Sequence, residues 1–299
     1  IHQLWSNSIS YRFFDGDKIF KGELALDKKG NIASTHFFVI NLSDEFSLMG
    51  NTRYFSPQYK SFRSNALSEN SRVQNEKACL IAGDYKVGKT QIYASADFFS
   101  FPAPKYLVQL PSYGRECMGY FNYEITDSLS FKLFYKQESK DKNQQSGFIN
   151  EPERYNLSHV YGKIIIKANR GITITSRLDF SKHTTDGFNS LGRTSYLELC
   201  HISEKNSLSA RIVFFKTDNW DTRIYLYEKD VLYHFSVPAL YDEGTRFYIN
   251  YNRTIGKHIK VWLKYSRTIF ENKSSISSGN NEIEGHLKTE IRGQIRIKL

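Results

Sequence analysis

Long apolar runs are missing from this chain of 299 residues. No stretch reaches the roughly 18 consecutive apolar residues that indicate a membrane-spanning helix, so a helical span is excluded. Three cysteines are too few, in so long a chain, to form a disulfide-stapled scaffold. No charged start with an apolar run and a small-residue cleavage site precedes the first pattern, and the first residue is isoleucine. We therefore expect a mature or truncated chain.

Aromatic residues, in contrast, are abundant, with 20 Tyr and 22 Phe in a chain that is 40% hydrophobic. This content is too high for intrinsic disorder, so the chain is expected to fold. A negative mean hydropathy is also compatible with a transmembrane barrel, in which lipid-facing apolar residues alternate with lumen-facing polar ones. Aromatic pairs such as Phe13-Phe14 and Phe214-Phe215 lie near the ends of predicted strands, where interfacial girdles need them.

Alternation with a period of two residues is the strongest pattern in the chain. In the last segment, Leu287, Ile291 and Ile295 fall on one face, and Lys288 and Arg292 fall on the other. The same alternation recurs in residues 128–136, 172–180, 246–252 and 259–265. Helical spacing of apolar residues is absent, so the sequence predicts an all-β, antiparallel protein.

Short and long connections alternate between the predicted strands. Tight turns are indicated at residues 126–128, 169–171, 204–206 and 256–258. Longer links are expected at residues 56–74, 102–116, 138–153, 182–192, 238–244 and 271–285. This asymmetry is typical of outer-membrane barrels, which have short periplasmic turns and long surface loops.

We therefore predict a single outer-membrane β-barrel domain over residues 1–299, an antiparallel transmembrane barrel of about 16–18 strands. If the tight turns face the periplasm, the first strand runs downward from the surface. An upward strand before it is then expected to be missing, which again indicates truncation at the N-terminus. A soluble β-sandwich or propeller is the alternative, since its strands also alternate.

Residues 83–90, GDYKVGKT, match the phosphate-binding motif G-x-x-x-x-G-K-[ST]. That motif requires a helix directly after it, whose N-terminal amides hold the phosphates. Residues 91–98 alternate as a strand instead. We therefore predict a hairpin turn between residues 77–83 and 91–99, and no nucleotide hydrolysis.

Metal and nucleophile signals are weak. Cys79, Cys117 and Cys200 are far apart and form no C-x-x-C pair. No catalytic, cofactor-binding or metal-binding residue is predicted, and no cofactor is expected. A surface hydrolase built on a barrel remains a third class, because a Ser/His/Asp site is assembled in space rather than in sequence.

The chain is basic, with 41 Lys and Arg against 31 Asp and Glu, a formal net charge of +10. Much of this charge lies on the polar faces of the predicted strands, which in a barrel line the lumen. A basic lumen would favour anionic solutes or nucleic acid. The alternative is a lumen in which Arg, Lys, Glu, Asp and Tyr satisfy one another.

The run at residues 215–241, FKTDNWDTRIYLYEKDVLYHFSVPALY, resembles the corresponding part of helix-hairpin-helix domain-containing outer-membrane proteins of Bacteroidota. Residues 277–291, SSGNNEIEGHLKTEI, look like the end of the same proteins. In that family a periplasmic region, with modules similar to competence-type DNA-binding domains, precedes the barrel. The resemblance therefore implies a barrel with a link to DNA. Residues 1–299 do not include such a region, and Leu299 stands where the family commonly has an aromatic residue.

A dense polar group lies within this run. Its members are Asp218, Asp221, Arg223, Tyr227, Glu228 and Asp230. One interpretation is that these acids and Arg223 pair in the lumen or fasten a loop, since charges removed from water must be paired. The other is that they bound a binding site.

The sequence thus predicts a non-enzymatic protein of the bacterial outer membrane. Its expected role is a channel or an anchor linked to uptake of DNA or anionic solutes. A plugged barrel that acts as a scaffold in an envelope protein complex is the alternative. The expected partners are outer-membrane lipid and lipopolysaccharide, then DNA or anionic solutes, and other envelope proteins.

Overall fold

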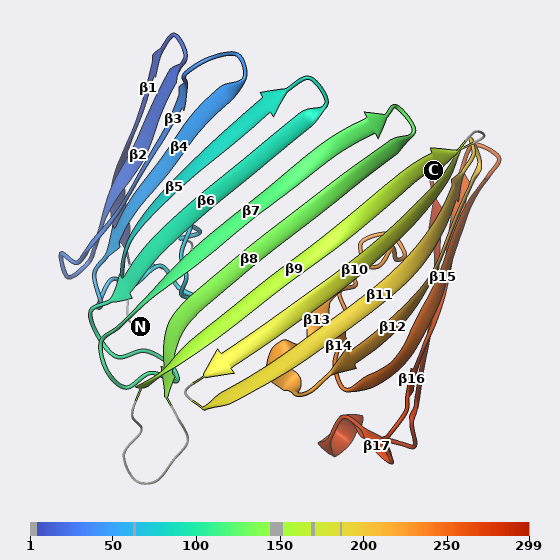
Figure 1. Cartoon of the computed structure of the whole chain (residues 1–299). Coiled ribbons are helices and arrows are strands. Elements are labelled where there is room, and N and C mark those ends of the chain that lie inside the picture. Colours follow the sequence, from blue (N-terminus) through green and yellow to red (C-terminus); the bar gives the residue numbers. More distant parts are fainter. Residues whose placement is uncertain (1–4, 62–63, 144–151, 169–170, 186, 299) are drawn as a thin grey trace. The chain divides into compact units, whose positions relative to one another are not determined.

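The computed structural model describes residues 5–61, 64–143, 152–168, 171–185 and 187–298. Within these ranges the chain forms nineteen strands and two short 3-10 helices, so the prediction of an all-β protein is confirmed. Fifteen strands make one sheet in the order β1 to β12, β15, β16 and β19 (Figure 1). The count of about 16–18 predicted strands lies between these fifteen and the total of nineteen.

The long strands of this sheet run for ten to seventeen residues. Their bounds are β1 Ser6–Asp15, β2 Lys18–Asp27, β3 Ile32–Asn41, β4 Phe46–Phe55, β5 Glu76–Val87, β6 Thr90–Phe101, β7 Ser112–Thr126, β8 Leu129–Asn143, β9 Pro152–Ala168, β10 Ile172–Thr185, β11 Phe188–Ile202, β12 Asn206–Thr217, β15 Glu243–Ile255, β16 Ile259–Phe270 and β19 Leu287–Ile297. The four short strands are β13 Ile224–Tyr225, β14 Ala239–Leu240, β17 Ser275–Ile276 and β18 Ile283–Glu284, and the 3-10 helices are η1 Trp220–Thr222 and η2 Gly279–Asn281.

The chain divides into two compact units. The first contains Ile1–Phe121, Phe134–Ser158 and Thr184–Phe188, and the second contains Asn122–Leu133, His159–His183 and Asn189–Leu299. In the first unit, β1 to β6 pair in antiparallel register along the chain. The link after β4 packs on this sheet, where Tyr59 and Val73 join Ala25, Ala33 and Phe55 in a buried apolar cluster.

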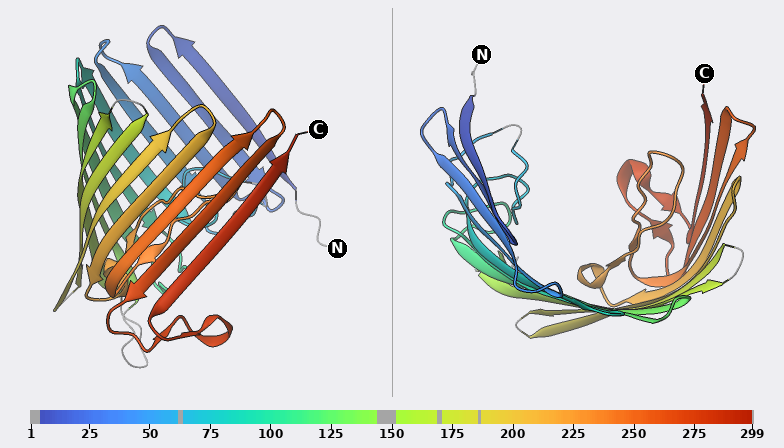
Figure 2. Two further views of the ribbon diagram at one scale, coloured as in Figure 1. Left: turned by 90° about the vertical axis from the view of Figure 1, so that its right-hand side faces the viewer. Right: turned by 90° about the horizontal axis from the view of Figure 1, so that it is seen from above.

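In the second unit, β11, β12, β15, β16 and β19 pair antiparallel in that order. The chain between β12 and β15, residues 218–242, lies on one face of these strands (Figure 2). We call this segment the strap. It contains η1 and the small ribbon in which β13 pairs with β14.

The two faces of the second unit's strands differ in an unusual way: the apolar face is exposed and the polar face is buried. On β16, Leu263 is 53% exposed, whereas the neighbouring Lys264 is 1% exposed. On β15, Ile249 is 45% exposed and Arg246 only 4%. A water-soluble sheet buries its apolar side chains. This reversal is instead the pattern of strands whose apolar face meets lipid and whose polar face points inward.

Most of the predicted turns are found between neighbouring strands of the structure. Residues 126–128, 204–206 and 256–258 do connect neighbouring strands, and Gly256 adopts a φ of +60° in its turn. The turn at residues 169–171 falls partly outside the described residues. The link predicted at 182–192 was wrong, because β10 runs to Thr185 and β11 begins at Phe188. Polar side chains there, such as that of His183, belong to the buried face of a strand, and a run of polar residues looks like a surface loop in sequence.

Strands also occupy parts of other predicted links, two of them in the first unit. β7 begins at Ser112, inside the link expected at 102–116, and β8 extends to Asn143, inside the link expected at 138–153. β9 begins at Pro152, inside the same link, and residues 144–151 lie outside the described residues. Among the described residues, no helix has the length and apolar character needed to cross a membrane.

The match to the phosphate-binding motif is a hairpin, as predicted. Residues 83–87 belong to β5, Thr90 begins β6, and Val87 pairs with Thr90. Gly88 adopts a φ of +53° at the turn, which explains the glycine there without a phosphate. No helix follows the motif to supply the amides that nucleotide binding needs.

Candidate functional site

The candidate site is the polar face of the second unit, where the strap meets the strands. Apolar contacts dock the strap first: Ile224, Leu226 and Leu240 are buried in one cluster with Phe215 and Phe270. Each of these three strap residues is about 2% exposed, so the strap is a packed part of the fold.

Gly192 of β11 makes room for the strap backbone. A Cβ atom at this position would lie 2.3 Å from the carbonyl oxygen of Thr222, so any larger residue would push the strap away. The Thr222 hydroxyl also donates to the carbonyl of Leu191 at 3.3 Å. The strap is therefore held against β11 by backbone contact as well as by apolar burial.

Glu228 is the central carboxylate of the strap. Arg246 of β15 donates to it through two nitrogens, Nε to Oε1 at 2.7 Å and Nη2 to Oε2 at 2.9 Å. The Nζ atom of Lys264 on β16 lies 3.1 Å from Glu228 Oε2. All three side chains are at most 4% exposed. Removing any one of them would leave a buried charge without its partner.

Asp230, two residues further along, is the second buried carboxylate of the strap. Its Oδ2 atom accepts from Lys264 Nζ at 3.1 Å, pairs with the guanidinium of Arg292 on β19 and lies 3.0 Å from His234 Nδ1. Burial raises the pKa of Asp230, but hydrogen bonds from the Val231 amide and Lys264, with the nearby charge of Arg292, outweigh it and hold the pKa below its usual value. Asp230 is therefore an anion that binds β16 and β19 together through the strap.

A third carboxylate, Glu198 of β11, lies on the same face. It accepts from Arg211 Nε at 2.7 Å and from the Tyr248 hydroxyl at 2.6 Å. Arg211 also donates through Nη1 to the backbone carbonyl of Tyr227 at 2.7 Å, which ties this pair to the strap. The guanidinium lies 4.3 Å above the ring of Tyr196. The strap is thus joined to β11, β12, β15, β16 and β19.

Further along the polar face, Asp179 of β10 is completely buried. It accepts from Arg177 Nε at 2.8 Å and lies 2.9 Å from His159 Nε2. Two lysines, Lys132 of β8 and Lys163 of β9, lie within electrostatic range of Arg177. These two lysines place two further positive charges on this face.

Lys163 has several cations near it. Lys132, Arg177 and Arg211 repel its positive charge, and Glu198 attracts it. Among the residues that the structure describes, no carboxylate lies within ion-pairing distance of Lys163. An anion near Lys163 would relieve this repulsion.

The structure brings together two of the six residues that the sequence singled out. Glu228 and Asp230 share Lys264 as a partner. Tyr227 contributes its backbone carbonyl, while its side chain is 53% exposed.

The other three lie in the first turn of the strap. Asp218 accepts a hydrogen bond from the amide of Leu191 on β11 at 2.8 Å. Asp221 belongs to η1, and its amide donates to the side chain of Asn219. Arg223 donates to the Tyr225 hydroxyl and to the Trp220 carbonyl, both at 2.7 Å, and stacks on the Trp220 ring.

Sequence reasoning missed the cations that hold the two carboxylates. Arg246, Lys264 and Arg292 each fall on the polar face of their strands. The face on which each cation lies could be predicted from the alternation. Which acid each cation contacts depends on how the strap folds back. The sequence analysis expected a link only at residues 238–244, whereas the strap extends over 218–242.

The first unit contains one group of carboxylates that could hold a metal ion. Oxygen atoms of Glu69, Glu116 and Glu138 all lie within 4.8 Å of one another, the one such group among the described residues. Glu116 and Glu138 are paired with Lys136 and Lys140. Burial, together with the charges of Glu116 and Glu138, raises the pKa of Glu69 to about 7. The group therefore binds a proton readily near neutral pH.

No protein-family model matches this chain, and no curated protein matches it. Its structure is similar to that of the copper transporter OprC, with a TM-score of 0.53 at 9% sequence identity, over 98% of this chain and 64% of that one. It is also similar to a loop-deletion mutant of OmpT, an outer membrane protein of Vibrio cholerae (TM-score 0.48, 8% identity, 98% of this chain and 96% of that one). A third is the Pseudomonas putida toluene transporter TodX (TM-score 0.33, 8% identity, 98% of this chain and 85% of that one).

These proteins are outer-membrane β-barrels, and the similarity to OprC shows that this chain shares their fold. The chain spans 64% of the length of OprC. The prediction of an antiparallel outer-membrane barrel fold is confirmed.

Proposed function

We propose that this protein is a bacterial outer-membrane β-barrel that serves, without catalysis, as a channel for anionic solutes. The reversal of the two faces carries the proposal. Leu263 and Ile249 are about half exposed, while Lys264 and Arg246 are buried beside them. Half-exposed apolar side chains suit contact with lipid, and a charged inner face suits a pathway for polar solutes.

The preference for anions is supported by Lys163. It lies on the polar face beside Arg177 and Arg211, whose charges Asp179 and Glu198 already neutralise. Positive charge on the wall of a pore favours anions. The formal net charge of +10 has the same sign.

DNA is the more specific form of this proposal. The resemblance of residues 215–241 to helix-hairpin-helix outer-membrane proteins of Bacteroidota supports it, because modules of that kind are similar to competence-type DNA-binding domains. Phosphates would interact with lysines such as Lys163 as simpler anions do. Competition between a short DNA strand and inorganic phosphate for the pore distinguishes the two substrates.

Single-channel recording in a planar bilayer tests the proposal. We expect the wild-type protein to conduct with a preference for chloride over potassium. Lys163→Gln should reduce that preference severalfold. Lys89→Gln, at the exposed hairpin turn of β5 and β6, is the matched control and should leave selectivity unchanged. A wild-type pore that prefers cations would contradict the proposal.

A scaffold with a closed lumen is the second candidate, and the fastening of the strap favours it. Glu228, Asp230, Arg246 and Lys264 are all buried and paired, which holds the strap firmly on the polar face. Replacing Glu228 with Gln should weaken this attachment. Conductance that is absent in the wild type and in this variant would favour the scaffold over the channel.

A further inference from the structure

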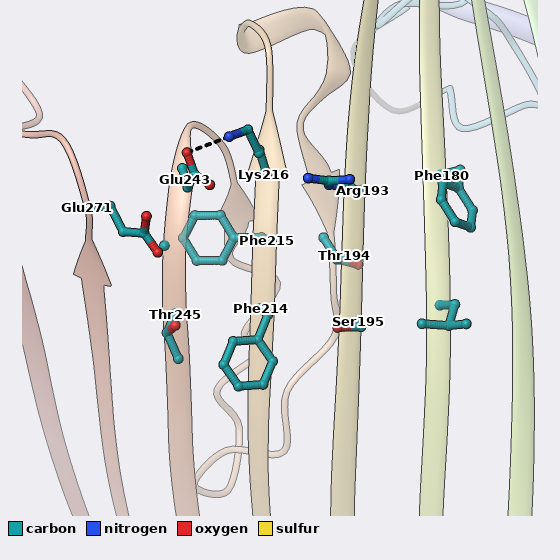
Figure 3. Close-up of a pocket in the computed structure, with 12 residues that line it drawn as sticks. Phe180, Arg193, Thr194, Ser195, Phe214, Phe215, Lys216, Glu243, Thr245 and Glu271 are labelled. Atoms are coloured by element: carbon teal, nitrogen blue, oxygen red, sulfur yellow. Dashed lines mark hydrogen bonds and ion pairs between the residues drawn. The ribbon is translucent and has the colours of Figure 1, made fainter.

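The exposed face of the second unit has a hollow of about 410 Å³ at one end of its strands, on the side opposite the strap. In Figure 3 its charged side chains form one row, from Glu271 through Glu243 and Lys216 to Arg193. Phe214 and Ser195 lie in the next row. The hollow thus has a charged upper edge and an apolar lower part.

The apolar part is broad and exposed. Leu178, Phe180 and Phe214 are each between 53% and 55% exposed. Ser195 lies directly opposite Phe214 in the register, and its small side chain leaves space beside that ring (Figure 3). Apolar space beside a ring on a lipid-facing surface suits an acyl chain.

The charged row contains two cations opposite each other. Arg193 of β11 pairs in register with Lys216 of β12 on the same face. Like charges in this arrangement destabilise a sheet unless an anion compensates them. Lys216 has such an anion, since its Nζ atom lies 2.7 Å from Glu243 Oε2. Among the residues that the structure describes, Arg193 has no hydrogen bond or ion pair through its side chain.

The hollow lies at the end of the strands from which the strap and the link at residues 271–286 emerge. Outer-membrane barrels place their long loops on the extracellular side, so this end belongs to the outer leaflet. The phosphorylated lipid of that leaflet is lipopolysaccharide. A phosphate has the charge and geometry that a guanidinium binds best.

We propose that this hollow is a binding site for the lipid A part of lipopolysaccharide. Arg193 binds a phosphate of lipid A, with Lys216 beside it, and an acyl chain lies over Ser195 beside Phe214. The site would anchor the barrel in the outer leaflet whether its lumen is open or closed. This inference depends on the membrane location that the proposed function includes, and it does not depend on transport.

Binding of the purified barrel to vesicles tests this site. Vesicles of phosphatidylethanolamine that contain lipid A are compared with vesicles that contain dephosphorylated lipid A, and each lipid's affinity is measured by fluorescence transfer. Arg193→Gln should weaken lipid A binding about tenfold, as the loss of one charge-assisted hydrogen bond implies. It should not alter binding of the dephosphorylated lipid.

Arg253→Gln is the matched control. Arg253 is exposed on the same face of β15 but lies near the short turn at the opposite end, so its replacement should leave lipid A binding unchanged. Phe214→Ala should weaken binding of both lipids alike. Equal binding of lipid A by the wild type and Arg193→Gln, or an equal loss in Arg253→Gln, would overturn the site. A protein that does not insert into either vesicle would instead contradict the proposed membrane location.

Discussion

Arg246 and Glu228 form a two-pronged ion pair, with N–O distances of 2.7 and 2.9 Å, that joins strand β15 to the strap. Both side chains are at most 4% exposed. The remaining guanidinium nitrogen of Arg246 donates to the Thr268 hydroxyl at 2.7 Å, so β16 belongs to the same network. The pair is thus the point at which the strap and two strands depend on one another.

Arg246→Ala should therefore lower the free energy of unfolding by about 3–5 kcal/mol, because it leaves Glu228 buried without its main partner. Loss of the compact, heat-resistant form on gels and a lower urea midpoint would measure this change. Arg223→Ala is the comparison. Arg223 stacks on Trp220 and donates hydrogen bonds to neighbouring groups of the strap. We therefore expect its replacement to lower the free energy of unfolding by about 1 kcal/mol. Equal losses in the two variants would contradict the central role of Arg246.

Leu263→Arg tests whether the exposed apolar face meets lipid. Leu263 lies in the middle of β16 and is 53% exposed, so in a water-soluble sheet this change would be nearly neutral. In a bilayer it should cost about 2–4 kcal/mol, falling to about 0–1 kcal/mol near the interface. Ile255→Arg, beside the turn at Gly256, is the interfacial control. Unfolding measured in lipid vesicles should separate the two variants, and equal costs would argue against a membrane-embedded face.

Much of this architecture could be predicted from alternation alone. The last strand showed it most clearly, since Ile291 and Ile295 are exposed and Arg292 points to the strap. Period two fixes the face of each residue, because a register shift of one residue would reverse every side chain. It also explains the wrong link at residues 182–192, since a strand with a polar buried face looks like a loop when burial is equated with apolar character.

The partners within the site could not be predicted in the same way. Glu228 and Asp230 were singled out because they are close in sequence, but their cations are contributed by strands that follow the strap. Arg292 lies 62 positions after Asp230 in the chain. Which cation meets which acid depends on how residues 218–242 fold back on the sheet, and a local pattern contains no information on that.

The hairpin at Gly88 gives a test of the phosphate-binding motif. Lys89→Ala should change neither stability nor nucleotide binding, because Lys89 is an exposed turn residue. Gly88→Val should destabilise the hairpin by about 1–3 kcal/mol, since a branched residue is strained at a φ of +53°. Thermal unfolding and a titration with a fluorescent nucleotide measure the two effects. Nucleotide binding that Lys89→Ala abolishes would refute the hairpin interpretation.

Glu69 should make the link at residues 56–75 sensitive to pH. Its pKa is raised to about 7 by burial and by Glu116, Glu138 and Asp97, while Lys140 opposes these effects. A carboxyl group whose folded pKa exceeds its unfolded value contributes stability that is complete below the unfolded pKa, near 4.5, and is lost as the pH rises through about 7. We therefore expect hydrogen exchange of residues 64–75, corrected for its intrinsic pH dependence, to become faster between about pH 5 and pH 8.

Glu69→Gln should remove this dependence and protect the link at pH 8, because the amide cannot ionise beside the other carboxylates. Glu282→Gln, at an exposed position in the second unit, is the control and should behave as the wild type. The protection of the link also depends on Glu76, whose carboxylate accepts from the amides of Glu69 and Asn70. An unchanged pH dependence in Glu69→Gln would contradict this prediction and would assign the effect to the surrounding acids.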